Sequence, residues 1–417
     1  MGITAYKNAL LPEKEGLYDI VVQDGKFLEI APGAAARHPD ARVEDLGGRL
    51  VSAPFADAHI HFDYFYTAAL PSKGNGSGTL FEAIDNWSLF KESLDKRSVR
   101  ERALKGIRQM IANGVQYART HVDVTAKKQT ALEVMLELKE ELAPYMEIQI
   151  VAFPQEGYYA YEGGDKCVEQ ALRMGADVVG GIPHYEFTRE EGVRSIEKGF
   201  ELAQKYGKLI DFHCDESDDE QSRFSEVLAS LAWHSGMQGM VTASHTCAMG
   251  SYNGAYAFKM MSKYKKAGLN FVSCPTENCY LQGRFDNFPQ RRGLTRVEQL
   301  TDNGLNVCFA QDSISDPWYP LGNGSLMHQL DFGLHLAHMM TIPQIVSSLK
   351  FVTTNGARTM RVEDYGLEAG KSASFVVLDE DNVVDAVRNT AHVILSVRKG
   401  AEIMRKQPEK LLTPMPE

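Results

Sequence analysis

The sequence predicts an α/β fold: an eight-stranded parallel barrel ringed by helices, with a small β-domain formed by both ends of the chain. Three observations predict it. Short apolar runs alternate with helix-like segments, polar side chains gather at the carboxyl ends of those runs, and the two flanks have a hairpin-like pattern instead. The alternating region covers roughly 260 residues, close to the ~250 that are typical of a barrel. The prediction is therefore a (β/α)₈ TIM-like barrel with a small β-sandwich domain.

The predicted barrel strands are apolar at nearly every position, as expected of parallel strands that are buried on both faces. They lie at residues 50–62, 114–124, 147–157, 176–186, 209–216, 240–246, 269–275 and 305–312. Segments with helical periodicity separate them, such as 98–114 and 192–207, and both end at glycine, a common helix stop. A doubly wound open sheet is the alternative. We favour the barrel because an active face at the carboxyl ends of the strands is typical of barrels.

The two flanks are predicted to form one small domain. Residues 1–51 and 362–417 contain short strand-like runs with turns at Asp24-Gly25 and Lys399-Gly400. Neither flank is long enough for a core of its own. The predicted division is thus a β-domain from both flanks and a catalytic barrel at 52–361.

Composition limits the partners. The 417 residues include 55 acidic and 44 basic side chains, a net charge of −11, which argues against nucleic-acid polymers or anionic membranes as partners. A free base as a small-molecule substrate stays possible. The six cysteines form no CxxC pair, so neither a cysteine-based zinc site nor a disulfide framework is expected. The chain lacks an export signal and any apolar run of about 18 residues, so a cytoplasmic location is expected.

Four predicted strands carry metal-competent side chains at their ends. His59 and His61 alternate on the first strand and therefore point the same way. His213, His245 and Asp312 end the fifth, sixth and eighth strands. Each has an ordinary alternative, such as a buried structural histidine or a helix-capping aspartate. Together, imidazoles and a carboxylate suit one Zn²⁺ or Fe²⁺ ion with an open position for water, and a cation would offset the cost of burying the carboxylate.

This pattern resembles the amidohydrolase superfamily. Longer stretches across nearly the whole chain, including "SGTLFEAIDNW", "HCDESDDEQSRF", "LQGRFD" and "DPWYPLG", resemble the barrel-type bacterial cytosine deaminases or a close relative acting on C5-substituted cytosine. The signature of the unrelated HxE…PCxxC zinc deaminases does not occur. The resemblance implies a homo-oligomer that hydrolyses cytosine, 5-methylcytosine or both to uracil or thymine and ammonia.

The resemblance also implies roles for single residues. One divalent metal per subunit, Fe²⁺ or Zn²⁺, would be held by His59, His61, His213 and Asp312. Glu216 would shuttle protons, and His245 would orient the attacking hydroxide and stabilise the oxyanion. The chemistry of deamination supports these roles. Attack of hydroxide at C4 of cytosine requires protonation of ring N3 by a nearby acid, and Asp312 can take the proton of the water. The alternative for Glu216 is a solvated residue of the acidic run 215–220.

Four residues are implied in substrate binding. Gln155 would hydrogen-bond the amide edge of the pyrimidine, and Trp318 with Phe153 would wall the ring. Ser313 departs from the family, which usually has a second carboxylate after the metal-binding aspartate. The smaller serine leaves room for about one methyl group near C5, so 5-methylcytosine is expected to react at least as well as cytosine. A tolerated, functionally neutral change is the alternative.

Other functions remain open. The segment "CPTENCYLQG" after the seventh strand is more polar than usual for the family, which leaves the exact substrate open. The same chemistry could deaminate isoguanine or creatinine. A cyclic-amide hydrolase of the dihydroorotase type usually has a lysine at the end of the fourth strand, where this chain reads "GGIPHYEF". A non-catalytic metal-binding scaffold would have lost Glu216 or Gln155, and both are present.

Overall fold

The structure, a computed structural model, describes residues 2–70 and 74–408. Its centre is an eight-stranded parallel sheet in which the strands pair in chain order. The strands are β6 (Phe55–Ile60), β7 (Val115–Asp123), β8 (Glu147–Phe153), β9 (Val178–Gly181), β10 (Leu209–Cys214), β11 (Val241–His245), β12 (Asn270–Ser273) and β13 (Asn306–Phe309). Each lies within one of the predicted runs, so the predicted strands are confirmed.

The chain just beyond β13 closes the sheet onto β6. Ile60 and Asp312 form a parallel bridge, in which the amide of Asp312 donates to the carbonyl of His59 (2.9 Å) and the amide of His61 donates to the carbonyl of Asp312 (3.2 Å). The alternative of a doubly wound open sheet is therefore wrong.

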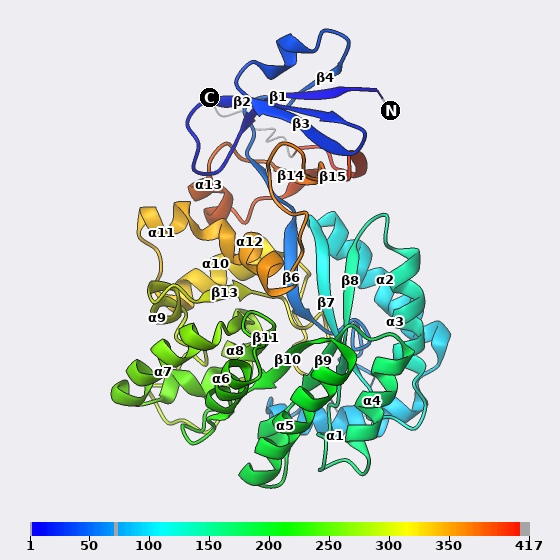
Figure 1. Cartoon of the computed structure of the whole chain (residues 1–417), viewed down its shortest axis with the longest axis vertical. Helices are drawn as coiled ribbons and strands as arrows, with labels where there is room; N and C mark the ends of the chain where they lie inside the picture. Colours follow the sequence, from blue (N-terminus) through cyan, green and yellow to red (C-terminus); the bar gives the residue numbers. More distant parts are fainter. Residues whose placement is uncertain (1, 71–73, 409–417) are drawn as a thin grey trace.

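Helices surround the barrel (Figure 1). The two helices predicted by periodicity are confirmed as α2 (Lys96–Ala112) and α5 (Arg189–Tyr206). Each begins where a side chain caps a backbone amide: Asp95 accepts from Ser98, and Thr188 accepts from Glu191. The others are α3 (Thr130–Glu141), α4 (Gly164–Met174), α6 (Phe224–His234), α7 (Gly254–Ala267), α9 (Val297–Asp302), α10 (Leu326–Ala337), α11 (Ile342–Val346), α12 (Thr354–Thr359) and α13 (Val383–Arg388).

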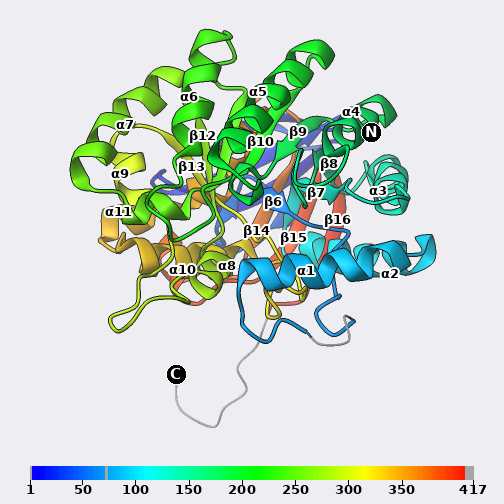
Figure 2. The same ribbon diagram turned by 90° about the horizontal axis from the view of Figure 1, so that it is seen from below.

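Two further helices lie at the carboxyl ends of the strands. The helix α1 (Leu80–Phe90) comes between β6 and α2, and α8 (Pro275–Leu281) follows β12 directly. Figures 1 and 2 place α1 at the lower end of the barrel, away from β1 to β4. Short 3₁₀ turns complete the order: η1 (Ala34–Arg37), η2 (Lys91–Ser93), η3 (Pro183–Tyr185), η4 (Cys247–Ser251) and η5 (Ser348–Val352).

Both flanks contribute to a pair of four-stranded sheets, with orders β3-β2-β1-β4 and β16-β15-β14-β5. Their strands are β1 (Thr4–Leu10), β2 (Leu17–Gln23), β3 (Lys26–Ala31), β4 (Arg42–Asp45), β5 (Val51–Ser52), β14 (Phe375–Leu378), β15 (Val393–Arg398) and β16 (Ala401–Arg405). The sheets share one apolar core, in which the ring of Tyr6 lies 5.0 Å from that of Phe375. The predicted small β-domain is confirmed, while its boundaries at 51 and 362 stay a prediction.

All six cysteines are free thiols, as the absence of a disulfide pattern predicts. Among the described residues, no helix combines the length and the apolar character that a membrane crossing requires.

Candidate active site

Four side chains meet where the barrel closes. His59 lies on β6, His61 follows it, His213 lies on β10, and Asp312 follows β13. Nε2 of His213 lies 3.2 Å from Nε2 of His59 and 3.2 Å from Nε2 of His61. Oδ1 of Asp312 lies 3.4 Å from each of these two imidazole nitrogens of His59 and His61. The structure thus brings together the predicted metal ligands.

These distances fit one small divalent ion. Neighbouring ligand atoms around such an ion stand roughly 3.3–3.4 Å apart, close to the distances from His213 to His59 and His61 and from Asp312 to the same two residues. The ring of His61 is fixed for this role, because its Nδ1 donates to the carbonyl of His121 (3.0 Å) and leaves Nε2 free. We refer to His59, His61, His213 and Asp312 as the four-ligand cluster.

The charge states also suit a metal. Burial, together with the neighbouring imidazoles, lowers the pKa of His213 well below its ordinary value, so its ring is neutral, as a ligand must be. Burial alone would raise the pKa of Asp312, but His59 and His245 hold it well below the ordinary value, so Asp312 is a carboxylate. Its second oxygen, Oδ2, is buried without a hydrogen-bond partner.

The backbone is strained where the site residues turn inward. Asp312 has a φ of 65° and His245 a φ of 69°, both in the left-handed region that non-glycine residues rarely adopt. Each such residue costs about 1–3 kcal/mol, and strain of this kind gathers at functional sites. Buried Asp57 supports the closure, since its Oδ1 accepts from the amide of Gln311 (3.2 Å).

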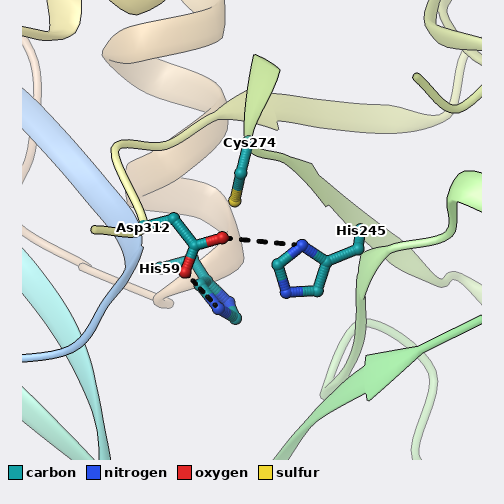
Figure 3. A group of neighbouring side chains, drawn as sticks. All are labelled: His59, His245, Cys274 and Asp312. Carbon is teal, nitrogen blue, oxygen red and sulfur yellow. Dashed lines mark ion pairs between the residues drawn. The ribbon is translucent and has the colours of Figure 1, made fainter. Parts of the chain in front are cut away.

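Glu216 and His245 lie beside the cluster. Nδ1 of His245 stands 3.6 Å from Oε1 of Glu216 and 3.7 Å from Oδ2 of Asp312 (Figure 3 shows the pairing with Asp312). Burial and the charge of Asp312 raise the pKa of Glu216 well above its ordinary value, which favours the protonated carboxyl. It lies in the acidic run but is only 3% exposed, so it is not a solvated surface residue.

Neighbouring residues hold these two side chains in place. Asp215 accepts from the amides of Phe224 (2.8 Å) and Ser225 (3.0 Å), which anchors the loop that carries Glu216 to the start of α6. On the other side, the side-chain amide of Asn278 donates from Nδ2 to Nδ1 of His245 (3.0 Å). The strand ends and α8 thereby fix the groups that would move protons.

A small, partly open cavity adjoins the cluster. Its lining residues are His61, Tyr64, Leu80, Gln155, His213, Glu216, His245, Glu277, Asp312, Ser313 and Trp318. Tyr64 stacks on Trp318, with ring centroids 4.8 Å apart, and its hydroxyl donates to Oε1 of Gln155 (2.9 Å). Leu80, the first residue of α1, also lines the cavity. Aromatic and polar side chains thus line the same cavity beside the cluster.

Phe153 belongs to the same apolar cluster as Tyr64, Leu80 and Trp318, one step behind the cavity lining. Its ring stacks on His213, with centroids 4.0 Å apart and planes 15° apart, and it is not among the lining residues. It therefore supports a ligand of the cluster, while Tyr64 is the aromatic partner of Trp318 at the cavity. The loop after the first strand is rich in aromatic residues, which was the signal for Tyr64 in the sequence.

Several other residues of the site were not predicted from the sequence. His121 on β7 lies 3.9 Å from His59, ring to ring, and its buried ring nitrogens make no hydrogen bond, although Nε2 lies 3.8 Å from Oδ2 of Asp211. Glu277 of α8 lines the cavity, and its only signal was the polar segment after the seventh strand. Cys274 points toward the carboxylate of Asp312 (Figure 3), and the ligand atoms of Cys274, His59, His245 and Asp312 all lie within 4.8 Å of one another, so this group too could hold a metal.

Known proteins resemble the chain over nearly its full length. The solved structure of 5-methylcytosine deaminase from Klebsiella pneumoniae liganded with 5-fluorocytosine is 50% identical, with a TM-score of 0.96, and the match covers 99% of this chain and 100% of that one. N-isopropylammelide isopropyl amidohydrolase of Pseudomonas sp. (strain ADP) is 29% identical over 414 residues, 96% of this chain and 97% of that protein. Pterin deaminase of Rhizobium rhizogenes is 26% identical over 414 residues, which are 95% of this chain and 91% of that protein.

The family model described as "Amidohydrolase family" matches residues 42–403, a range that includes the barrel and every predicted site residue. On this match, and on the full-length similarity to a solved deaminase, the chain belongs to the amidohydrolase family.

Proposed function

We propose that the protein is a metal-dependent hydrolytic deaminase of free pyrimidine bases, which converts cytosine and 5-methylcytosine to uracil and thymine with release of ammonia. The observation that carries the proposal is the cavity whose lining includes His61, His213 and Asp312 of the four-ligand cluster together with the buried carboxyl of Glu216. The 50% identity to a 5-methylcytosine deaminase supports the choice of substrate.

His59, His61, His213 and Asp312 would hold one divalent ion, Fe²⁺ or Zn²⁺, since imidazole and carboxylate ligands serve either. When bound, such an ion lowers the pKa of water toward ~7, so that hydroxide is available at neutral pH.

Glu216 supplies the proton that the ring needs. Cytosine resists attack at C4 until N3 is protonated, and the buried carboxyl of Glu216 gives that proton. Asp312 accepts a proton from the attacking water through its free oxygen Oδ2 and helps to pass it to the departing ammonia. His245, between these two carboxyl groups, orients the nucleophile and stabilises the charge that develops on oxygen.

Binding uses the remaining lining residues. Gln155 hydrogen-bonds the amide edge of the ring, and the hydroxyl of Tyr64 fixes its side chain. Trp318 walls the ring, and Phe153 contributes by packing on His213. Ser313 faces C5 and leaves room for a methyl group.

Other amino-heterocycles remain the second candidate, because relatives at 29% and 26% identity act on different compounds. A cyclic-amide hydrolase with two metals is disfavoured, since the segment from Gly181 to Tyr185 at the end of β9 has no lysine. For the whole protein, we propose a homo-oligomer in the cytoplasm, where free thiols persist.

An ammonia-release assay with cytosine, 5-methylcytosine, isoguanine and creatinine tests the proposal. We expect turnover of the two cytosines, and at least equal kcat/KM for 5-methylcytosine. Turnover of isoguanine or creatinine alone would establish the second candidate instead.

A further inference from the structure

We propose that Glu277 and Ser313 form a hydrogen-bonding edge of the cavity that binds a hydroxyl group carried on C5 of cytosine, so that 5-hydroxymethylcytosine is a substrate. The proposal rests on the proposed function and extends it to bases with a polar C5 substituent. The reaction is water plus 5-hydroxymethylcytosine to 5-hydroxymethyluracil plus ammonia: a C4–O bond forms, the C4–N bond breaks, and the C5 group is unchanged.

Glu277 is a buried carboxyl group with an unused hydrogen-bonding atom. It lies on α8, is 3% exposed and lines the cavity. Its Oε2 is buried and has no hydrogen-bond partner. A buried polar atom without a partner costs about 1–3 kcal/mol, and a polar group of a molecule bound in the cavity could supply the missing partner.

No basic side chain among the described residues forms an ion pair with Glu277. Burial raises its pKa well above the ordinary value, the charges of Asp312 and Asp316 add to this, and the hydroxyl of Ser313 opposes it. The same hydroxyl acts on Asp316, whose pKa burial raises to about 7. Glu277 and Ser313 both line the cavity, so a substituent bound there can contact both.

The position of this edge follows from the rest of the ring. C4 must face the four-ligand cluster, N3 must face Glu216, and the amide edge formed by N1 and the C2 carbonyl faces Gln155. Tyr64 and Trp318 stack on each other and form an aromatic wall of the cavity. The polar lining residues left over are Ser313, next to Asp312 in the chain, and Glu277. The ring atom next to C4 on the side away from N3 is C5, so these two residues face C5.

A hydroxyl group suits this edge whether Glu277 carries a proton or not. A carboxylate accepts from the substrate hydroxyl, and a carboxylic acid donates to it; Ser313 can do either. A methyl group fills space but leaves Oε2 of Glu277 without a partner. An ethyl group has the same number of heavy atoms as a hydroxymethyl group and cannot hydrogen-bond, which makes it the matched control ligand.

The test compares kcat/KM for 5-hydroxymethylcytosine and 5-ethylcytosine, measured by ammonia release, in the wild type and in Glu277→Leu and Glu277→Gln. The wild type should prefer the hydroxymethyl base by at least about 10-fold, because sites built to hydrogen-bond a hydroxyl reject analogues that lack it. Glu277→Leu should abolish or reverse the preference. Glu277→Gln, which can still donate and accept, should keep most of it.

Equal use of the two bases by the wild type, or a preference that Glu277→Leu leaves unchanged, would overturn the proposal. The wild-type comparison decides the question even if the leucine variant does not fold. Cytosine is assayed alongside: turnover of cytosine without the hydroxymethyl preference defeats this inference alone, whereas no turnover of any cytosine defeats the proposed function.

Discussion

Ile60 and Asp312 form the backbone bridge that closes the barrel, and the same bridge sets the spacing of three metal-competent side chains. Ile60 lies between His59 and His61, whose backbone groups bond to Asp312 on either side of the bridge. The register that joins the first strand to the last therefore also brings Oδ1 of Asp312 to 3.4 Å from both imidazoles. The backbone contacts that close the barrel therefore also position these ligands.

Removal of the Asp312 carboxylate should therefore reduce metal content and turnover together. In Asp312→Ala, the cluster loses its only anionic ligand, so we expect well under one equivalent of metal per chain and no measurable deamination. Elemental analysis of the purified protein and an ammonia-release assay measure the two effects. Full metal content with normal turnover would show that Asp312 is not a ligand.

Glu216→Gln should separate binding from chemistry. The amide keeps the size of the side chain but cannot give a proton to N3, so turnover should fall by roughly 10²–10⁴-fold while metal content is retained. Glu220→Gln, in the same acidic run but exposed, is the matched control and should behave as the wild type. Near-normal kcat in Glu216→Gln would rule out proton transfer by this residue.

Tyr64→Phe tests the positioning of Gln155. The change keeps the stacking on Trp318 and removes the hydroxyl that donates to Oε1 of Gln155. Loss of one hydrogen bond of about 0.5–1.5 kcal/mol should raise KM for cytosine roughly 2- to 13-fold and change kcat less. The control is Tyr66→Phe, whose hydroxyl bonds to Gln109 instead. Gln155→Ala should weaken binding further; equal KM values in wild type and Tyr64→Phe would contradict the assignment.

Ser313→Asp should shift the preference from 5-methylcytosine toward cytosine. A buried methyl group contributes about 0.8 kcal/mol, or roughly 4-fold, and a charged side chain facing it adds a desolvation cost. The measurement is the ratio of kcat/KM for the two bases in wild type and variant. A wild type that strongly prefers cytosine, with the ratio unchanged in the variant, would show that Ser313 does not face C5.

The local patterns of the sequence were enough to predict the barrel and the metal-competent side chains at one face of it, and the family resemblance then selected the four-ligand cluster among them. Apolar runs and helical periodicity are properties of short segments, and the alternation of His59 and His61 fixes their common direction whatever the rest of the chain does. Since parallel strands of a barrel end at one face, His213 and Asp312 could be assigned to the same site.

Residues whose roles depend on packing between distant segments could not be predicted. Phe153 precedes Gln155 by two residues, yet it packs on His213 because the end of β8 turns its ring toward the cluster. His121 lies in the middle of a buried strand, where its sequence neighbours give no sign of the ring of His59 beside it. Glu277 reaches the cavity only because α8 starts directly after β12.

The central claim is a metal-dependent deamination of free cytosine bases, and one measurement tests it most directly. The purified protein is stripped of metal with a chelator, reconstituted with Fe²⁺ or Zn²⁺, and assayed for ammonia release from cytosine and 5-methylcytosine. We predict no turnover without metal and full recovery at one equivalent of metal per chain, with thymine as the product of 5-methylcytosine. Unchanged turnover of the stripped protein, a requirement for two equivalents, or no ammonia from either base would contradict the account.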